Sequence, residues 1–186
     1  MVGSRFRTGK SITMLDTGKQ ITEPMTMVTD YLLTALCVLL AIELLRRAGR
    51  SKRRSIVLWV ASFFIAAVAA LAGGTAHGFK LYLGENHAAV WTVTVYSIGL
   101  SAILMLLAGI RSAKRPTTAD AARRSTGHKW LKAGLAVSAA GVLIQQIGIG
   151  FHEHFNHNDI YHLVQMVGIT FFYRGALFLH DLTDEN

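Results

Sequence analysis

Residues 151–179 read FHEHFNHNDIYHLVQMVGITFFYRGALFL and join a polar start to a long apolar segment. The start contains four of the eight histidines of the chain: His152, His154, His157 and His162. The apolar part has about the 20 residues that an α-helix needs to cross the hydrocarbon core of a bilayer. We therefore expect a membrane-spanning helix with imidazoles and carboxylates at one boundary.

Four other apolar segments of similar length precede this one in the 186-residue chain. Backbone N–H and C=O groups in lipid must bond within their own segment, so each segment is expected to be a helix. The alternation typical of β-barrel strands is absent. The sequence thus predicts an all-α, polytopic membrane helix bundle with about five transmembrane helices. They are expected at residues 25–45, 55–79, 88–110, 131–151 and 160–179.

The composition supports a membrane protein. Hydrophobic residues make up 52% of the chain and charged residues 16%, whereas a soluble domain has roughly 25% charged residues. The net charge is +8. The basic residues lie between the apolar segments rather than on one amphipathic face, which argues against nucleic acid as a partner and for the lipid bilayer. The single Cys37 lies in an apolar segment, so no disulfide framework is expected.

Lys and Arg residues are concentrated in the first and third links between the expected helices. The second link has only Lys80 and the fourth has none, so the positive-inside rule places the N-terminus outside and the C-terminus inside. The expected location is the plasma (inner) membrane. We expect a polar basic tail at 1–22, the bundle at 23–180 and a short tail at 181–186. The basic residues of the first and third links and their flanks are Arg46, Arg47, Arg50, Lys52, Arg53, Arg54, Arg111, Lys114, Arg115, Arg123, Arg124, Lys129 and Lys132.

Polar side chains from four segments are expected to converge near the outer face. Asp30 lies seven residues into the first segment, or roughly 10 Å deep at 1.5 Å per residue. An ionisable group at that depth normally faces the bundle interior, a partner or a wet cavity. The expected polar layer consists of Asp30, His77, Gln145 and His162.

Imidazole and carboxylate groups in this layer suit zinc, which uses three protein ligands and a water in catalytic sites. The metal would make that water a nucleophile at neutral pH. The predicted catalytic residues are Asp30 and His77. The predicted metal ligands are His77, His157, His162 and Asp159.

Three short motifs carry a family resemblance: TEPMTMVTDY at 22–31, GGTAHGF at 73–79 and NDIYHLVQMVG at 158–168. They resemble the alkaline ceramidase and progestin-receptor-like membrane hydrolase superfamily, which includes hemolysin-III-like proteins. That family has a Ser four residues before its second-helix His, where this chain has Gly73. It opens its last helix with His-x-x-x-His, where this chain has Asn158 first. The resemblance implies zinc and a lipid (amide) substrate.

In that zinc hydrolase, the third ligand would come from one of three side chains: Asp30, His157 or Asp159. Two other functions fit the same residues. His77 and His162 on facing helices could be the axial ligands of haem b in an electron-transfer protein. Alternatively, the polar layer and the glycines of the second helix serve packing in a non-enzymatic assembly subunit, receptor-like module or small transporter, as a homo-oligomer or with a partner subunit.

Overall fold

The computed structural model describes residues 20–48, 54–112, 121–150, 152 and 155–179. The expected tails fall mainly on residues 1–19 and 180–186, outside the described residues. The described helices are α1 (Pro24–Ala48), α2 (Arg54–Gly78), α3 (Lys80–Leu83), the short 3-10 helix η1 (Gly84–Asn86), α4 (His87–Ser112), α5 (Ala121–Ile147) and α6 (His157–Leu179).

Five helices in the described part of the chain are long and apolar enough to cross a membrane. Among the same residues the β-structure is limited to a single bridge between His152 and Phe155. Large apolar side chains face outward on the outer helices: Leu106 of α4 is 65% exposed and Leu143 of α5 is 61% exposed. Such an exterior suits lipid rather than water. The predicted all-α multi-pass membrane bundle is therefore confirmed.

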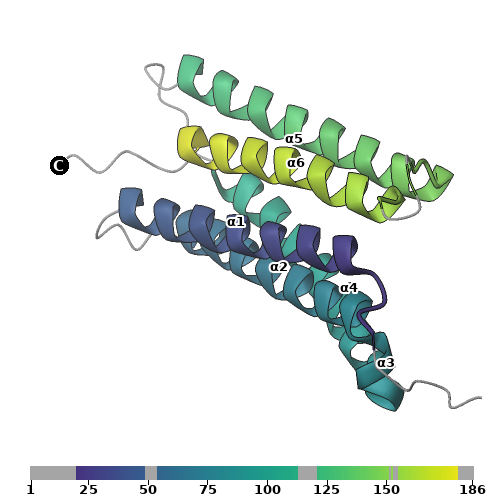
Figure 1. Ribbon diagram of the computed structural model, residues 1–186. Helices are drawn as coiled ribbons and strands as arrows, with labels where there is room; N and C mark the ends of the chain where they lie inside the picture. The colour runs from purple at the N-terminus through teal and green to yellow at the C-terminus, as the bar shows by residue number, and fades with distance from the viewer. Residues whose placement is uncertain (1–19, 49–53, 113–120, 151, 153–154, 180–186) are drawn as a thin grey trace, which may run out of the picture.

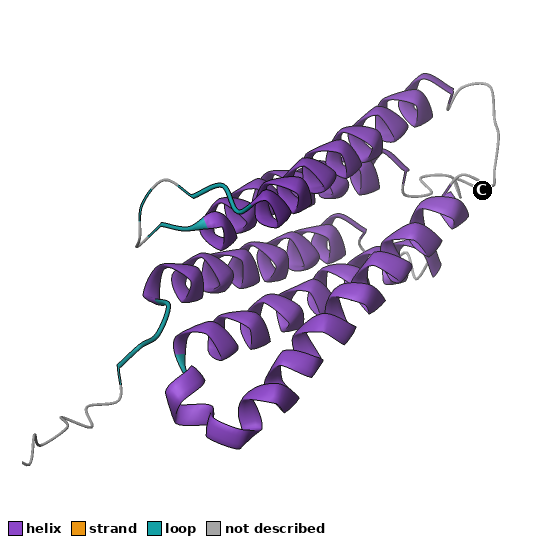
Figure 2. Ribbon diagram, turned by 90° about the vertical axis from the view of Figure 1, so that its right-hand side faces the viewer, coloured by secondary structure: helices purple, strands orange, loops and turns teal. Residues whose placement is uncertain are grey.

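The long helices pack in the order α4, α2, α1, α6, α5. In Figure 1, α5 and α6 lie side by side above α1, α2 lies below it, and α4 passes behind it. Helix α1 thus joins two units, the α2–α4 pair and the α5–α6 pair. Figure 2 shows the helices running alongside one another, with the short α3–η1 segment at one end.

The two ends of the bundle differ in chemistry. The site end holds Glu23 before α1, Gly78 at the close of α2 and His157 at the start of α6; there the N–H of Thr22 donates to the carbonyl of Gly78 at 3.1 Å. The opposite end, called the basic end below, holds Arg46, Arg47, Arg54 and Arg111.

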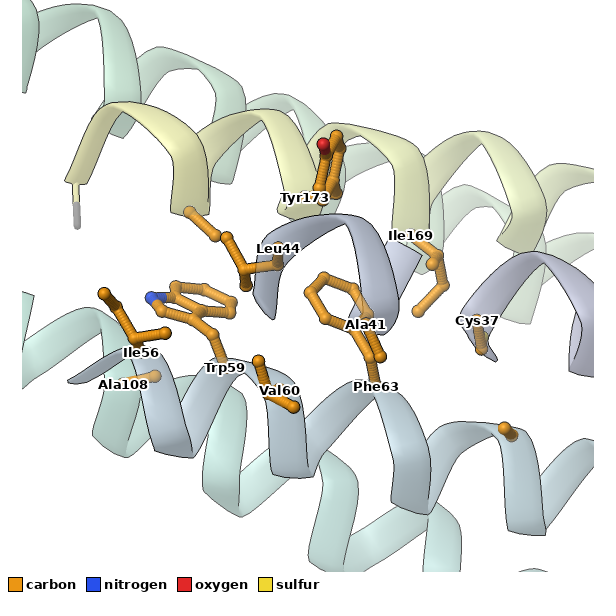
Figure 3. Packing of buried hydrophobic residues seen from close by; sticks show 12 residues of the cluster. Cys37, Ala41, Leu44, Ile56, Trp59, Val60, Phe63, Ala108, Ile169 and Tyr173 are labelled. Atoms are coloured by element: carbon orange, nitrogen blue, oxygen red, sulfur yellow. The ribbon is translucent and has the colours of Figure 1, made fainter. Parts of the chain in front are cut away.

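The apolar core lies between the site and the basic end and joins α1, α2, α4 and α6 (Figure 3). Trp59 and Phe63 of α2 stack with ring centroids 6.4 Å apart. Phe63 also meets the ring of Tyr173 on α6 edge-on at 6.4 Å. Cys37 of α1, on the site side of this cluster, is fully buried, as its apolar neighbours predict. This packing closes the bundle on the basic side of Asp30.

Small residues determine how α5 packs against α6. Glycines recur every seventh residue on the facing surfaces: Gly127, Gly134 and Gly141 on α5, and Gly168 and Gly175 on α6. A Cβ added at Gly168 would lie 2.5 Å from Oγ of Ser138, and one added at Gly134 would lie 3.2 Å from the carbonyl of Gly168, so the two helices approach closely there. A repeat of seven keeps such a seam continuous between two supercoiled helices, and small residues at the seam are typical of membrane helix pairs.

Four of the five expected helices agree with the structure to within three residues at each end. The prediction for the start of the fourth helix was wrong. Helix α5 begins at Ala121, ten residues before the expected 131, because the helix includes a basic segment that precedes its apolar part. It ends at Ile147 rather than 151, since Gly148 adopts φ +77°, which glycine tolerates best. Arg123, counted as part of a basic link, instead lies on α5 and donates from Nη2 to the carbonyl of Leu177 at 3.2 Å, near the end of α6.

Candidate functional site

A buried polar contact joins Asp30 of α1 to His162 of α6. His162 Nε2 lies 3.2 Å from Asp30 Oδ1, and the two residues are only 6% and 4% exposed. The contact therefore links the two helical units across the α1–α6 junction. An unpaired ionisable group in a membrane interior is costly, so each side chain supplies the partner that the other needs.

Thr29, the neighbour of Asp30, fixes the orientation of the imidazole. Its hydroxyl donates to the carbonyl of Thr26 at 3.0 Å, and its Oγ1 lies 2.9 Å from His162 Nδ1. A hydroxyl has one hydrogen to donate. With that hydrogen on the Thr26 carbonyl, Nδ1 carries a proton and donates to Thr29; in the other tautomer the Thr29 hydroxyl donates to Nδ1 instead.

This arrangement determines what lies between His162 Nε2 and Asp30 Oδ1. With Nδ1 protonated, a 3.2 Å contact is attractive only if one further proton is shared there. The pair is then either imidazolium with carboxylate or imidazole with carboxylic acid, and both forms have zero net charge. Once that proton is removed, Nε2 can still donate to the carboxylate only in the other tautomer, which requires the Thr29 hydroxyl to turn from the Thr26 carbonyl to Nδ1. The geometry thus describes a site that is stable while it holds a proton.

Asp159 belongs to the same region and lies in the first turn of α6. Its Oδ2 accepts from the N–H of Asn156 at 2.7 Å, while Asn156 Oδ1 accepts from the N–H of Asn158 at 2.8 Å. This reciprocal arrangement is a capping box and places Asp159 one turn before His162. Asp159 is fully buried, and its charge is close enough to interact electrostatically with Asp30. The two carboxyl groups therefore belong to one polar region.

Three buried oxygens in this region have no hydrogen-bond partner among the described residues. They are Thr26 Oγ1, Asp30 Oδ2 and Asp159 Oδ1. Thr26 and Asp30 are four residues apart and so share a face of α1. Buried polar oxygens without partners are uncommon and call for an explanation such as a catalytic role, a bound ion or water.

Glycines of α2 allow the close approach of α1 beside the site. A Cβ added at Gly73 would lie 3.1 Å from Asp30 Oδ2, and one at Gly74 would lie 2.8 Å from the ring of Tyr31. The Tyr31 hydroxyl lies 3.2 Å from Oγ1 of Thr75. The backbone of α2 therefore forms the wall behind the Asp30 carboxylate.

A second acid–histidine pair lies nearer the site end of the bundle. His77 Nδ1 is 3.1 Å from Glu23 Oε2, with side chains 17% and 36% exposed. The ring of Trp91 meets the His77 ring edge-on at 5.5 Å. Thr22 donates its hydroxyl to the backbone carbonyl of His77. His77 also interacts electrostatically with His162, so the two pairs are neighbours even though each has its own partner.

A model of a family of unknown function, DUF6962, matches residues 25–124 and 117–181. The chain belongs to this family. No curated protein and no solved structure matches the chain. The DUF6962 match includes Asp30 and His77 in its first part and Asp159 and His162 in its second, so both sides of the α1–α6 contact lie within the family region.

The expected polar layer is only partly assembled. Asp30 and His162 meet as predicted, while His77 pairs with Glu23. Gln145 donates from Nε2 to Asn158 Oδ1 at 3.0 Å between α5 and α6, and Asn158 lies one turn before His162 on α6. Two partners, Thr29 and Glu23, were not predicted. Polar residues recur at helical spacing in this part of the sequence: Thr22, Thr26, Thr29 and Asp30. The sequence did not show which helix this polar face would meet.

The histidine-rich start of residues 151–179 contributes less than its composition suggests. His157 is the first residue of α6 and is partly buried, and His152 is exposed. His154 and Glu153 lie outside the described residues. Within the part of the chain that the structure describes, no three His, Cys, Asp or Glu side chains lie together as metal ligands do. The predicted set of His77, His157, His162 and Asp159 therefore does not form a ready-made metal site there.

Proposed function

We propose that this protein is a non-enzymatic, proton-responsive membrane module, of the receptor-like or transport kind. In this proposal the proton shared by Asp30 and His162 holds α6 against α1. The observation that supports it is the Thr29–His162–Asp30 chain: while the Thr29 hydroxyl donates to the Thr26 carbonyl, the Nε2–Oδ1 contact of 3.2 Å depends on a second proton.

The contact between α1 and α6 is expected to weaken as the pH rises. At low pH the pair retains its proton and the α1–α6 contact is kept. At high pH the pair becomes imidazole and carboxylate, which stay bonded only if Thr29 gives up its hydrogen bond to Thr26 and donates to Nδ1, and the contact weakens. The titratable groups around the pair are Asp159 and Tyr161 on α6, Glu23 beside α1 and His77 on α2.

Proton access is expected from the site end alone. Glu23 and His77 are partly exposed there and lie beside the buried pair. On the other side of Asp30, the α1 residues Cys37, Ala41 and Leu44 are fully buried in the apolar core. A group reached from one side suits sensing or coupling, whereas a proton channel would need a polar path through this core.

Distance measurements between the two helical units test this proposal. Spin labels at Val95→Cys on α4 and Leu143→Cys on α5, both exposed positions, would be compared in a Cys37→Ala background reconstituted in lipid. The distance should increase between about pH 5 and about pH 8, the range in which histidine titrates. Asp30→Asn should abolish the change, and the matched control Glu43→Gln, on the same helix near the basic end, should keep it. An unchanged distance in the parent protein, or the same change in Asp30→Asn, would refute the proposal.

A zinc-dependent lipid hydrolase is a second candidate, supported by one observation. Metal-binding histidines usually donate their second N–H to an acceptor that fixes the ring, as His162 does to Thr29. Asp30 and His162 could be two ligands, and His77, one turn along α2 from Gly73, could be the third after leaving Glu23. Zinc there would supply an activated water.

Metal analysis separates this candidate from the first. Stoichiometric zinc in the purified protein, lost in His77→Ala and retained in the control His128→Ala, would support the hydrolase. Protein free of zinc after purification without chelators would exclude it. Haem b is disfavoured because Asp30 and Thr29 engage both nitrogens of His162, and we expect no Soret band.

A further inference from the structure

A groove lies between α2 and α4 at the basic end of the bundle, which is the end opposite the polar site of Asp30. Its volume is about 270 Å³. It is lined by three apolar side chains and two arginines: Val57, Leu58, Leu107, Arg54 and Arg111. The lining is almost wholly apolar, so Arg54 and Arg111 border the groove mainly with their aliphatic stems, at the end of two spanning helices.

Within the described part of the chain, neither guanidinium has an ion-pair or hydrogen-bond partner. Arg54 is the first residue of α2, where the helix dipole disfavours a cation, so its charge does not serve the helix. The positive-inside rule explains basic residues at this end but does not require two of them to line one apolar groove.

We propose that this groove binds one anionic phospholipid. The phosphate lies between Arg54 and Arg111, which can each donate two hydrogen bonds to it, and the adjoining acyl chain packs on Val57 and Leu107. Val57 is 56% and Leu107 43% exposed, so both have apolar surface to offer. A free phosphate would gain nothing from these side chains, and basic pockets between spanning helices are typical of lipid headgroup sites.

Lipid titration of the full-length protein in detergent tests the charge contribution. Phosphatidylglycerol should bind saturably and phosphatidylcholine should not. Each basic residue near a membrane contributes about a fivefold factor, so the double variant Arg54→Gln, Arg111→Gln should lower phosphatidylglycerol affinity on the order of 30-fold. The matched control Arg46→Gln, Lys129→Gln removes the same charge at the same end and should leave affinity nearly unchanged. Equal losses in the two double variants would show a diffuse charge effect and overturn the proposal.

A second variant tests the groove while keeping the charge. Val57→Trp fills the apolar part and leaves both arginines, so phosphatidylglycerol binding should fall as in the arginine variant. Undiminished binding by Val57→Trp would contradict the acyl-chain contact. Inorganic phosphate should not displace the lipid at equal concentration; if it does, the site binds phosphate and the lipid assignment is wrong.

Discussion

His162 Nε2 lies 3.2 Å from Asp30 Oδ1 across the junction between α1 and α6. Removing one partner of a buried pair leaves the other uncompensated, which destabilises by about 3 kcal/mol or more. Removing both side chains leaves no buried polar group without a partner, so the two losses in the free energy of unfolding should not add.

A double-mutant cycle therefore gives the first prediction. Asp30→Ala and His162→Ala should each lower the free energy of unfolding in detergent, and the double variant should be less destabilised than their sum by on the order of 1 kcal/mol. Additive losses would show that the two side chains do not interact.

The second prediction concerns the threonine that orients the ring. Thr29→Val keeps the shape of the side chain and removes the acceptor for Nδ1, so stability should fall by about 1 kcal/mol. Nitrogen NMR of labelled histidine should show Nδ1 protonated in the parent protein and in Thr29→Ser, and a changed protonation pattern in Thr29→Val. An unprotonated Nδ1 in the parent protein would contradict the hydrogen-bond assignment.

The third prediction uses the unpartnered oxygen of Asp30. A side chain at Gly73 would point toward Asp30 Oδ2, with its Cβ at 3.1 Å. Gly73→Ala adds only crowding, whereas Gly73→Ser adds a hydroxyl that can donate to Oδ2. The Ser variant should be more stable than the Ala variant by about 1 kcal/mol, measured by thermal unfolding. Identical stabilities would mean that the hydroxyl does not reach the carboxylate.

The fourth prediction compares two helical glycines. At Gly168 a Cβ would meet Ser138 Oγ at 2.5 Å, whereas at Gly99 on α4 it would meet nothing within 4 Å. Gly168→Ala should destabilise by about 1–3 kcal/mol through overpacking. Gly99→Ala should be neutral or stabilising by up to about 1 kcal/mol. Similar effects at the two positions would rule out the close α5–α6 seam.

The fifth prediction concerns the orientation of the bundle in the membrane. The positive-inside rule predicts that the basic end faces the cytoplasm. In a Cys37→Ala background, Glu85→Cys at the site end should react with a membrane-impermeant thiol reagent added to intact cells. Ser125→Cys, at the basic end of α5, should react only after the membrane is opened. The reverse pattern would invert the proposed topology.

The helices could be predicted from the sequence because lipid requires long apolar segments. The start of α5 could not, since Arg123 and Arg124 lie on a helix that extends beyond its apolar part. The Asp30–His162 contact was predictable because few other ionisable groups lie at that depth. The partner of His77 was not: Glu23 precedes α1, and only the packed bundle brings that chain segment against the end of α2.

The most direct test of the central claim is infrared difference spectroscopy of the protein in lipid, recorded as the pH is changed. A band that is present at low pH and lost at high pH is expected from the proton shared by Asp30 and His162: a carboxylic acid C=O band if the proton is on Asp30, or an imidazolium ring band if it is on His162. Asp30→Asn should remove this band and Glu43→Gln should retain it. A titrating band that persists unchanged in Asp30→Asn would contradict the assignment of the proton to this pair.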